Sequence, residues 1–105
     1  MAAGDIRQKI NQILDEIVNN FSLGENLKYI KVVNGEQTHF MLLIHGELPS
    51  GTFTNDLLIH FFVKDNKVFL LKNSTEFPLA DELVEKGIER ERITLPNHSE
   101  EMVFV

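Results

Sequence analysis

The stretch "DLLIHFFVKDNKVFLLK", residues 56–72, decides the fold because it predicts two strands joined by a very short turn. Apolar and β-branched residues fill both halves, and Asp65 and Asn66 stand between them. Both turn residues tolerate the left-handed backbone conformation that a two-residue hairpin requires. The sequence therefore predicts a β-hairpin with Asp65 and Asn66 at its tip.

This turn also predicts which residues of the two strands lie opposite each other. Counting outward from the tip gives the pairs Lys64 and Lys67, Val63 and Val68, Phe62 and Phe69, Phe61 and Leu70, and His60 and Leu71. Successive side chains of a strand point to opposite faces. The first predicted face carries Ile59, Phe61, Val63, Val68 and Leu70. The second predicted face carries Leu58, His60, Phe62, Phe69 and Leu71.

Both predicted faces of the hairpin are apolar, whereas a sheet with one wet face alternates apolar and polar residues. In a monomer, the N-terminal helix would have to cover one face while a C-terminal helix covers part of the other. Otherwise the second face meets another protein chain, because soluble monomers seldom leave a large apolar patch open. The second reading predicts self-association or tight pairing through Phe62 and Phe69.

Helix and strand patterns surround the hairpin on both sides. From Asp5 to about Asn20, apolar residues recur at helical spacing and predict an amphipathic helix that lies on a sheet. Residues 27–33 and 38–48 have strand-like composition, and "NGE" at 34–36 is a typical hairpin turn between them. The sequence thus places two further strands before the hairpin.

The segment "STEFPLADELVEKGIER", residues 74–90, predicts a short helix between two stop signals. We expect Thr75 to be the N-cap and Pro78 to lie in the first helical turn. We expect Gly87 to end the helix in a left-handed conformation, with Ile88 folding back onto Leu83. The acidic face of Glu82, Glu85 and Glu89 is expected to be solvated, and the carboxylates of Asp81, Glu82 and Glu85 are expected to keep ordinary pKa values.

These elements predict a single α+β domain over residues 1–105. It contains an N-terminal helix, an antiparallel β-meander of about four strands, a C-terminal helix and a final short strand. The final strand, "RITL" at 92–95, is expected to run parallel to the strand around Val68, since the connection is long enough for a crossover.

Composition and charge narrow the possible functions. The net charge is −6, and the basic residues are scattered, so direct nucleic-acid binding is not favoured. There is no cysteine, and neither a signal peptide nor a stretch long enough to span a membrane is apparent, which predicts a cytoplasmic protein.

The four histidines, His39, His45, His60 and His98, do not form a metal-binding pattern. His39 and His45 share one strand face but lie six residues apart, roughly 20 Å along a strand at ~3.3 Å per residue, too far to share one ion. His60 is expected to be a hydrogen-bonded core or interface residue. No nucleophile motif and no glycine-rich phosphate loop is present either, so the sequence predicts a non-enzyme without a cofactor.

The order of motifs in residues 59–95 resembles the XisI family, the fdxN-element excision controlling factors of cyanobacteria. The matching residues, in chain order, are Ile59–His60, Lys64–Asp65–Asn66–Lys67, Thr75–Glu76, Leu79 to Glu85, Gly87–Ile88 and Ile93–Thr94–Leu95. The chain departs from the family pattern in having no tryptophan and in its last segment, "PNHSEEMVFV".

The resemblance implies a controlling or accessory role in site-specific excision of a chromosomal DNA element, alongside a XisH-like protein and a recombinase. It implies action through protein–protein contact. We predict that the contact face consists of Leu58, His60, Phe62, Phe69 and Leu71, with Thr75 and Glu76 at its edge.

Two other functions remain open from the sequence. One is a small-ligand-binding protein or enzyme with a pocket formed by His60 and the acidic helix. The other is direct DNA binding through Lys64, Lys67 and Lys72, which predicts salt-sensitive association.

Overall fold

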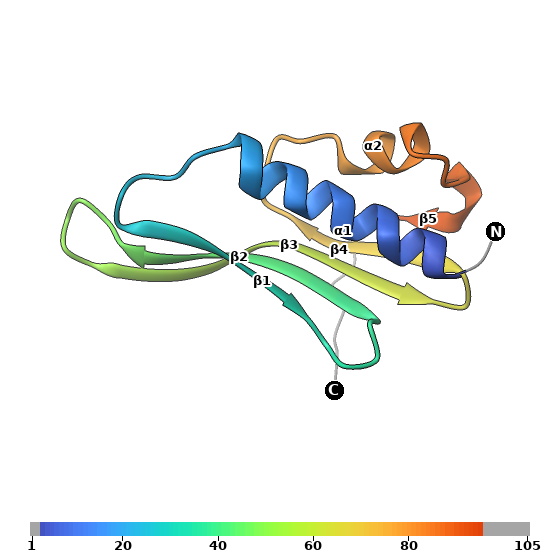
Figure 1. Ribbon diagram of the computed structural model, residues 1–105, viewed down its shortest axis with the longest axis horizontal. Coiled ribbons are helices and arrows are strands. Elements are labelled where there is room, and N and C mark those ends of the chain that lie inside the picture. Colours follow the sequence, from blue (N-terminus) through green and yellow to red (C-terminus); the bar gives the residue numbers. More distant parts are fainter. Residues whose placement is uncertain (1–2, 96–105) are drawn as a thin grey trace.

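The computed structural model describes residues 3–95 of the chain (Figure 1). Its elements follow one another in the predicted order. They are α1 (Ala3–Asn20), β1 (Leu27–Val33), β2 (His39–Glu47), β3 (Phe53–Lys64), β4 (Lys67–Asn73), α2 (Leu79–Glu85), the 3-10 helix η1 (Arg90–Arg92) and β5 (Ile93–Thr94). The predicted α+β class and element order are confirmed.

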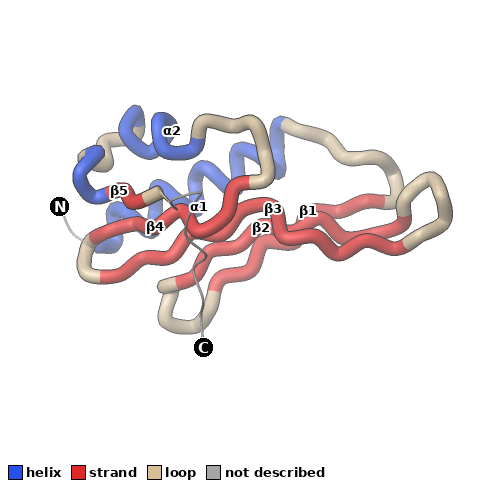
Figure 2. Tube along the Cα trace, turned by 180° about the vertical axis from the view of Figure 1, so that it is seen from behind, coloured by secondary structure: helices blue, strands red, loops and turns tan. Residues whose placement is uncertain are grey.

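The strands form one sheet in the order β1-β2-β3-β4-β5 (Figure 2). The first four strands pair in antiparallel fashion, and β5 runs parallel to β4, with Val68 opposite Ile93 and Phe69 opposite Thr94. The chain between β4 and β5 passes through α2, as a parallel connection requires. The predicted parallel final strand is therefore confirmed.

Both helices lie on the same side of the sheet, as Figures 1 and 2 show from opposite directions. The side chains of α1 and α2 meet the inward residues of β2, β3 and β4 in one hydrophobic core. This core is made of Ile6, Ile10, Ile13, Leu14, Ile17, Phe40, Leu42, Ile59, Phe61, Val63, Val68, Leu70, Leu79, Leu83 and Ile88. The monomer arrangement with one helix on each face is therefore wrong, since neither helix covers the second face.

The hairpin turn is as predicted, because Asp65 and Asn66 both have positive φ, 53° and 61°. The predicted pairs hold from Lys64 and Lys67 back to Phe61 and Leu70. Beyond them a β-bulge shifts the register, so that His60 lies opposite Lys72 and not opposite Leu71. A bulge adds one unpaired residue to a strand, and counting from the turn cannot reveal it.

A second irregularity changes the position of Leu58. The pairing of β2 with β3 shifts by one residue, so that Leu42 faces Ile59 while Leu43 faces Leu57. Leu58 has no partner in that ladder, and it packs against the hydrophobic core. The prediction that Leu58 lies on the second face is therefore wrong.

Helix α2 begins later than predicted. Thr75 is not its N-cap; its hydroxyl instead accepts a hydrogen bond from the backbone N–H of Phe77 at 3.2 Å. Such a local bond holds a turn ahead of the helix. The cap position is taken by Pro78, whose carbonyl accepts the N–H of Glu82 at 3.0 Å.

The predicted end of α2 is confirmed. Gly87 has a φ of 102°, and its N–H donates to the carbonyl of Val84 at 3.0 Å. The N–H of Ile88 donates to the carbonyl of Leu83 at 3.0 Å, which completes a Schellman motif. Both apolar partners of this motif are buried, so the helix end is fixed by the core.

Candidate functional site

The candidate site is the outer face, which we define as the side of β1–β4 that points away from both helices. Directly paired residues in antiparallel strands point to the same side, and Met41 links Val32 of β1 with His60 of β3. Ile30 and Val32 are 38% and 37% exposed, although they are large and apolar. The apolar side chains of this face include Ile30, Val32, Met41, Leu43, Phe53, Leu57, Phe62 and Phe69.

The structure brings three of the predicted interface residues together on the outer face: His60, Phe62 and Phe69. Phe62 and Phe69 lie directly opposite each other, and their ring centroids are 5.8 Å apart. All three are half-buried. They form one end of the outer face, near the hairpin tip.

The other predicted interface residues take no part in these strand pairings. Leu58 packs against the core, as described above. Leu71 is the unpaired residue of the bulge between Leu70 and Lys72. Thr75 and Glu76 lie in the connection between β4 and α2, beyond the end of β4.

A continuous row of rings crosses the outer face. Nδ1 of His39 lies 2.9 Å from Nε2 of His60. The His39 ring stacks on Phe62 with centroids 4.6 Å apart and an angle of 28° between the planes. We call His60, His39, Phe62 and Phe69 the aromatic row.

The histidine pair sets the charge of this row. A hydrogen bond between two imidazoles needs one nitrogen to donate and the other to accept, so the two rings cannot both be fully protonated while it is kept. Burial lowers the pKa of His60, and the neighbouring His39 lowers it further when charged. The neutral form of His60 is therefore favoured.

Sequence reasoning did not place His39 in this group. The two histidines lie diagonally across β2 and β3, because His39 is opposite Phe62 while His60 is opposite Met41. That register depends on the turn after β2 and on the shift near Leu42, and neither can be counted from the sequence. Strand parity, which puts His39 on the same side as Met41, was the signal available.

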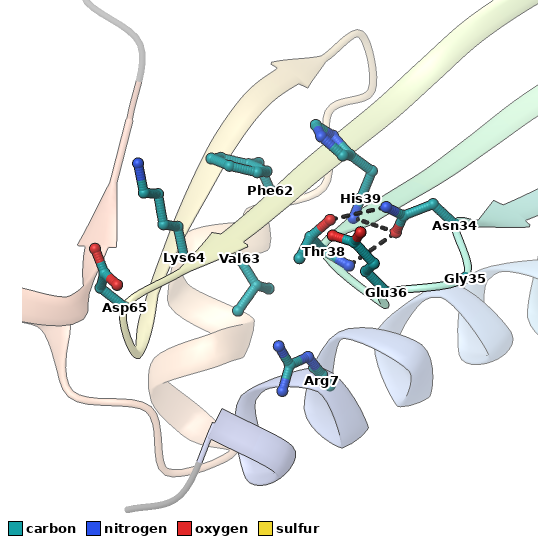
Figure 3. A pocket seen from close by; sticks show the side chains of 10 residues that line it. All are labelled: Arg7, Asn34, Gly35, Glu36, Thr38, His39, Phe62, Val63, Lys64 and Asp65. Atoms are coloured by element: carbon teal, nitrogen blue, oxygen red, sulfur yellow. Dashed lines mark hydrogen bonds between the residues drawn. The ribbon is translucent and has the colours of Figure 1, made fainter.

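An open hollow of about 780 Å³ lies at the end of the aromatic row (Figure 3). His39 and Phe62 form part of its wall, and Arg7 of α1 and Lys64 of β3 add positive charge. Glu36, in the loop between β1 and β2, adds a carboxylate. The hollow is therefore mixed in charge and continuous with the outer face.

The loop that forms one wall of this hollow is held by Asn34. Its side-chain oxygen accepts the backbone N–H groups of Thr38 at 2.8 Å and His39 at 2.9 Å (Figure 3). Arg7 fixes the same loop to α1, since its Nε donates to the carbonyl of Gln37 at 2.8 Å. The hairpin signal at residues 34–36 thus positions His39 as well as turning the chain.

The predicted pocket of His60 with the acidic helix does not form, because α2 lies on the helix side and His60 on the outer face. A smaller hollow of about 290 Å³ lies between α1 and α2 and contains Glu16, Asp81, Glu82 and Glu85. Burial and nearby carboxylates raise the pKa of Glu82. The prediction of ordinary pKa values for this helix is therefore wrong at Glu82, which is half-buried.

Two general features of residues 3–95 bear on function. No three histidine, aspartate or glutamate side chains in this range converge as ligands of one metal ion would. Neither helix of the same range is long and apolar enough to cross a membrane. His98 lies outside the described residues.

The matches to known proteins all point to the same family. A family model described as "XisI protein" matches residues 2–103. A XisI-like protein from Anabaena variabilis ATCC 29413 has a similar structure, with a TM-score of 0.81 and 23% identity over 90% of this chain and 85% of that one. The fdxN element excision controlling factor XisI from the same organism gives a TM-score of 0.73 and 17% identity over 91% of this chain and 94% of that one. No curated protein matches.

Proposed function

The chain belongs to the XisI family, and we propose that it is an accessory factor that controls excision of a DNA element through protein–protein contact. The similar fold of an fdxN element excision controlling factor supports this role. The proposal places its action in the cytoplasm, with a XisH-like protein and a site-specific recombinase as partners. It assigns no catalytic step and no cofactor to this chain.

The observation that carries the proposal is the uncovered outer face. Ile30, Val32, Phe62 and Phe69 form an apolar surface that neither helix of residues 3–95 covers. Contiguous exposed apolar surface on a sheet is typical of protein–protein contact. The aromatic row adds large, rigid rings of the kind that dominate binding energy at interfaces.

A retention experiment tests the contact. The chain is immobilised, and a XisH-like protein and the recombinase are passed over it separately. We expect the wild type to retain at least one of them and the variant Val32→Gln to retain about tenfold less, since an apolar contact of about 1.4 kcal/mol corresponds to that factor.

The matched control is Val18→Gln on α1. Val18 and Val32 have the same exposure, 37%, but lie on opposite sides of the sheet. Equal retention by both variants would show that the outer face is not the interface. Failure of the wild type to retain either protein would remove these partners from the proposal.

A small-ligand function is the second candidate, and the hollow beside His39 is the observation that favours it. Thermal unfolding across a panel of small anions and metabolites tests it. A compound that raises the melting temperature of the wild type but not of Arg7→Ala would support binding there, because Arg7 lines the hollow. No shift with any compound would count against this candidate.

A further inference from the structure

Strand β1 forms one edge of the sheet, and no other strand of residues 3–95 pairs with its free side (Figure 1). Its pairing with β2 runs from Leu27 to Val33 without a bulge, and the strand contains no proline. Bulges and prolines are among the devices by which proteins protect a sheet edge from further strand pairing. The opposite edge strand, β5, has only two residues. β1 is therefore the edge that can accept another strand along seven residues.

Two hydrogen bonds beyond the ends of β1 show which of its backbone groups point to the open side. At one end, the N–H of Asn34 donates to the carbonyl of His39 at 3.3 Å. At the other end, the N–H of Glu47 donates to the carbonyl of Asn26 at 3.1 Å. Bonds in an antiparallel ladder join alternate residue pairs, so the even-numbered residues of β1 bond to β2. The residues whose N–H and C=O groups point to the open side are Tyr29, Lys31 and Val33.

The two lysines of β1 protect this edge only in part, although charged side chains commonly serve that purpose. Lys31 lies on the helix side, where its Nζ is 2.8 Å from Oδ1 of Asp15 on α1. Lys28 lies on the outer face, near the beginning of the strand. The rest of the strand on that face is apolar, since it consists of Ile30 and Val32, which are 38% and 37% exposed.

β1 is self-complementary when two copies pair in antiparallel fashion about a two-fold axis. Only a register centred on Ile30 pairs all seven residues, and it places Ile30 opposite Ile30 of the second copy. Lys28 then lies opposite Val32 of the second copy, and Tyr29 lies opposite Lys31. No like charges are directly opposite each other, an arrangement that would be destabilising. An axis at Lys31 would place that lysine opposite itself, and an axis at Tyr29 would leave the end of the strand unpaired.

We propose that β1 pairs with β1 of a second copy of this chain, so that the two sheets continue into each other. The open backbone groups of Tyr29, Lys31 and Val33 form the ladder across the axis. The two Ile30 residues form a pair without backbone bonds between them, in which side chains approach most closely. Ile30 and Val32 of both copies then form one apolar strip, so each copy contributes residues to the outer face of the other. The inference goes beyond the proposed function, because it concerns the chain alone.

The competing arrangement is a second copy stacked face to face on the outer face, through Phe62 and Phe69. The outer face has charges of both signs on or beside it, since Lys67 lies near Asp65 of the hairpin turn and Glu47 lies at the end of β2. Charge therefore does not decide between the two arrangements. The backbone does, because face-to-face stacking gives the open N–H groups of β1 no partner.

Amide hydrogen exchange tests the ladder in the unmodified chain. When about nine-tenths of the chains are paired, exchange at Tyr29, Lys31 and Val33 should be about tenfold slower than in dilute protein, since only unpaired chains expose these amides. The N–H groups of Ile30 and Val32, which bond to β2, are the internal control and should depend much less on concentration.

Three outcomes of this experiment would overturn the proposal. One is a chain that sediments as a monomer up to about 1 mM, the weak limit of specific binding. Another is association that leaves exchange at Tyr29, Lys31 and Val33 unchanged. The third is full protection of these amides in the dilute monomer, which would show that the chain itself covers the edge.

Opposite charges at residue 30 test the register. Ile30→Lys and Ile30→Glu should each sediment as a monomer, because each places two like charges directly opposite each other across the axis. An equimolar mixture of the two variants should pair again, since lysine then faces glutamate. Val18→Lys on α1 is the matched control: Val18 is also 37% exposed, and this variant should pair like the wild type. Unchanged pairing of Ile30→Lys, or a mixture that stays monomeric, would overturn the proposal.

Residue 32 separates this pairing from face-to-face stacking. Val32→Glu places a carboxylate opposite Lys28 of the second copy and should pair at least as tightly as the wild type. Val32→Lys should pair about tenfold more weakly, because the two-fold axis applies each like-charge pair twice. In a face-to-face contact both variants would bury a charge and both would weaken it. Equal weakening by both, with loss of pairing in Phe69→Gln, would assign the second copy to the outer face and overturn the β1 pairing. All of these measurements use the chain alone, so their result is independent of whether a XisH-like protein or a recombinase is retained.

Discussion

The side of the sheet that faces the helices and the side that faces away are both apolar, but they differ in packing and in charge. On the helix side, Phe40 and Phe61 are fully buried, and each ion pair of residues 3–95 has at least one member on a helix or next to one. On the outer face, Val32 remains 37% exposed, and neither Lys28 nor Lys64 belongs to an ion pair within that range. The pattern of apolar residues along the strands therefore does not show which face of the sheet packs into the core.

What separates the faces is the position of the two helices, which lie on the same side of the sheet. The stripe of Ile6, Ile10 and Leu14 on α1 is continued by Leu79 and Leu83 on α2, and all five residues are buried against one face. Only one such layer can form with two helices placed side by side. The second face keeps apolar side chains that neither helix of residues 3–95 covers.

The largest expected effect distinguishes the faces by two neighbouring residues. Phe61→Ala removes a ring that is fully buried and should lower the free energy of unfolding by about 3–5 kcal/mol. Phe62→Ala, on the outer face, should lower it by about 1 kcal/mol, since its ring is half-buried and no helix packs on it. Urea unfolding followed by circular dichroism measures both, and equal losses would show that the outer face is also covered.

The next effect concerns the end of α2, which closes the helix side. Gly87→Val should cost about 1 kcal/mol or more, because a β-branched residue tolerates a φ of 102° poorly. No atom lies within 4 Å of a Cβ at this position, so the cost comes from the backbone and not from a clash.

Gly24→Val is the control, since its surroundings are equally open and Gly24 is not among the residues with positive φ. It should change the melting temperature less than Gly87→Val does. Similar losses in both variants would mean that the Schellman motif is not what holds Ile88 in the core.

Much of this architecture could be predicted from the sequence. Asp65 and Asn66 fixed the hairpin because few residue pairs suit a two-residue turn, and Gly87 fixed the helix end because few residues adopt its conformation. These signals are local, so they need no knowledge of the neighbouring strands.

The features that were missed depend on contacts between distant residues. The bulge at Leu71 and the inward turn of Leu58 arise from strand pairings whose register shifts inside the sheet. The bond between His39 and His60 joins residues 21 positions apart and depends on that register. The placement of both helices on one side of the sheet likewise depends on how they pack, and the order of apolar residues along the strands does not show which face they will cover.

A smaller effect compares two lysines of β1 on opposite faces. Lys31 donates to Asp15 of α1 at 2.8 Å, and its side chain is 29% exposed. Lys31→Met should lower the free energy of unfolding by about 0.2–1 kcal/mol at low salt, the range for pairs near the surface, and by less at high salt. Lys28→Met, on the outer face, should change stability less. A larger loss for Lys28 would show that the outer face carries the stronger charge contact.

The smallest expected effect is the pH dependence of the aromatic row. Burial and the nearby His39 lower the pKa of His60 below its ordinary value of 6.5 in the folded chain. Lys72, opposite His60 on β4, is a further positive group beside it. As the pH falls below about 6.5, the unfolded chain therefore binds this proton before the folded chain does.

The stability contributed by neutral His60 is thus fully present above that pH and is lost as the pH falls through the lowered folded pKa. His60→Gln keeps a polar group that can bond to His39 but does not titrate in this range. The melting temperature of the wild type should consequently fall more than that of the variant when the pH is lowered from 7 to 5. Because the imidazole is only half-buried, the difference should be the smallest of the four. A variant that loses as much as the wild type would mean that the outer face does not discriminate between the charged and the neutral ring. The neutral form of His60 would then add nothing to the stability of the outer face.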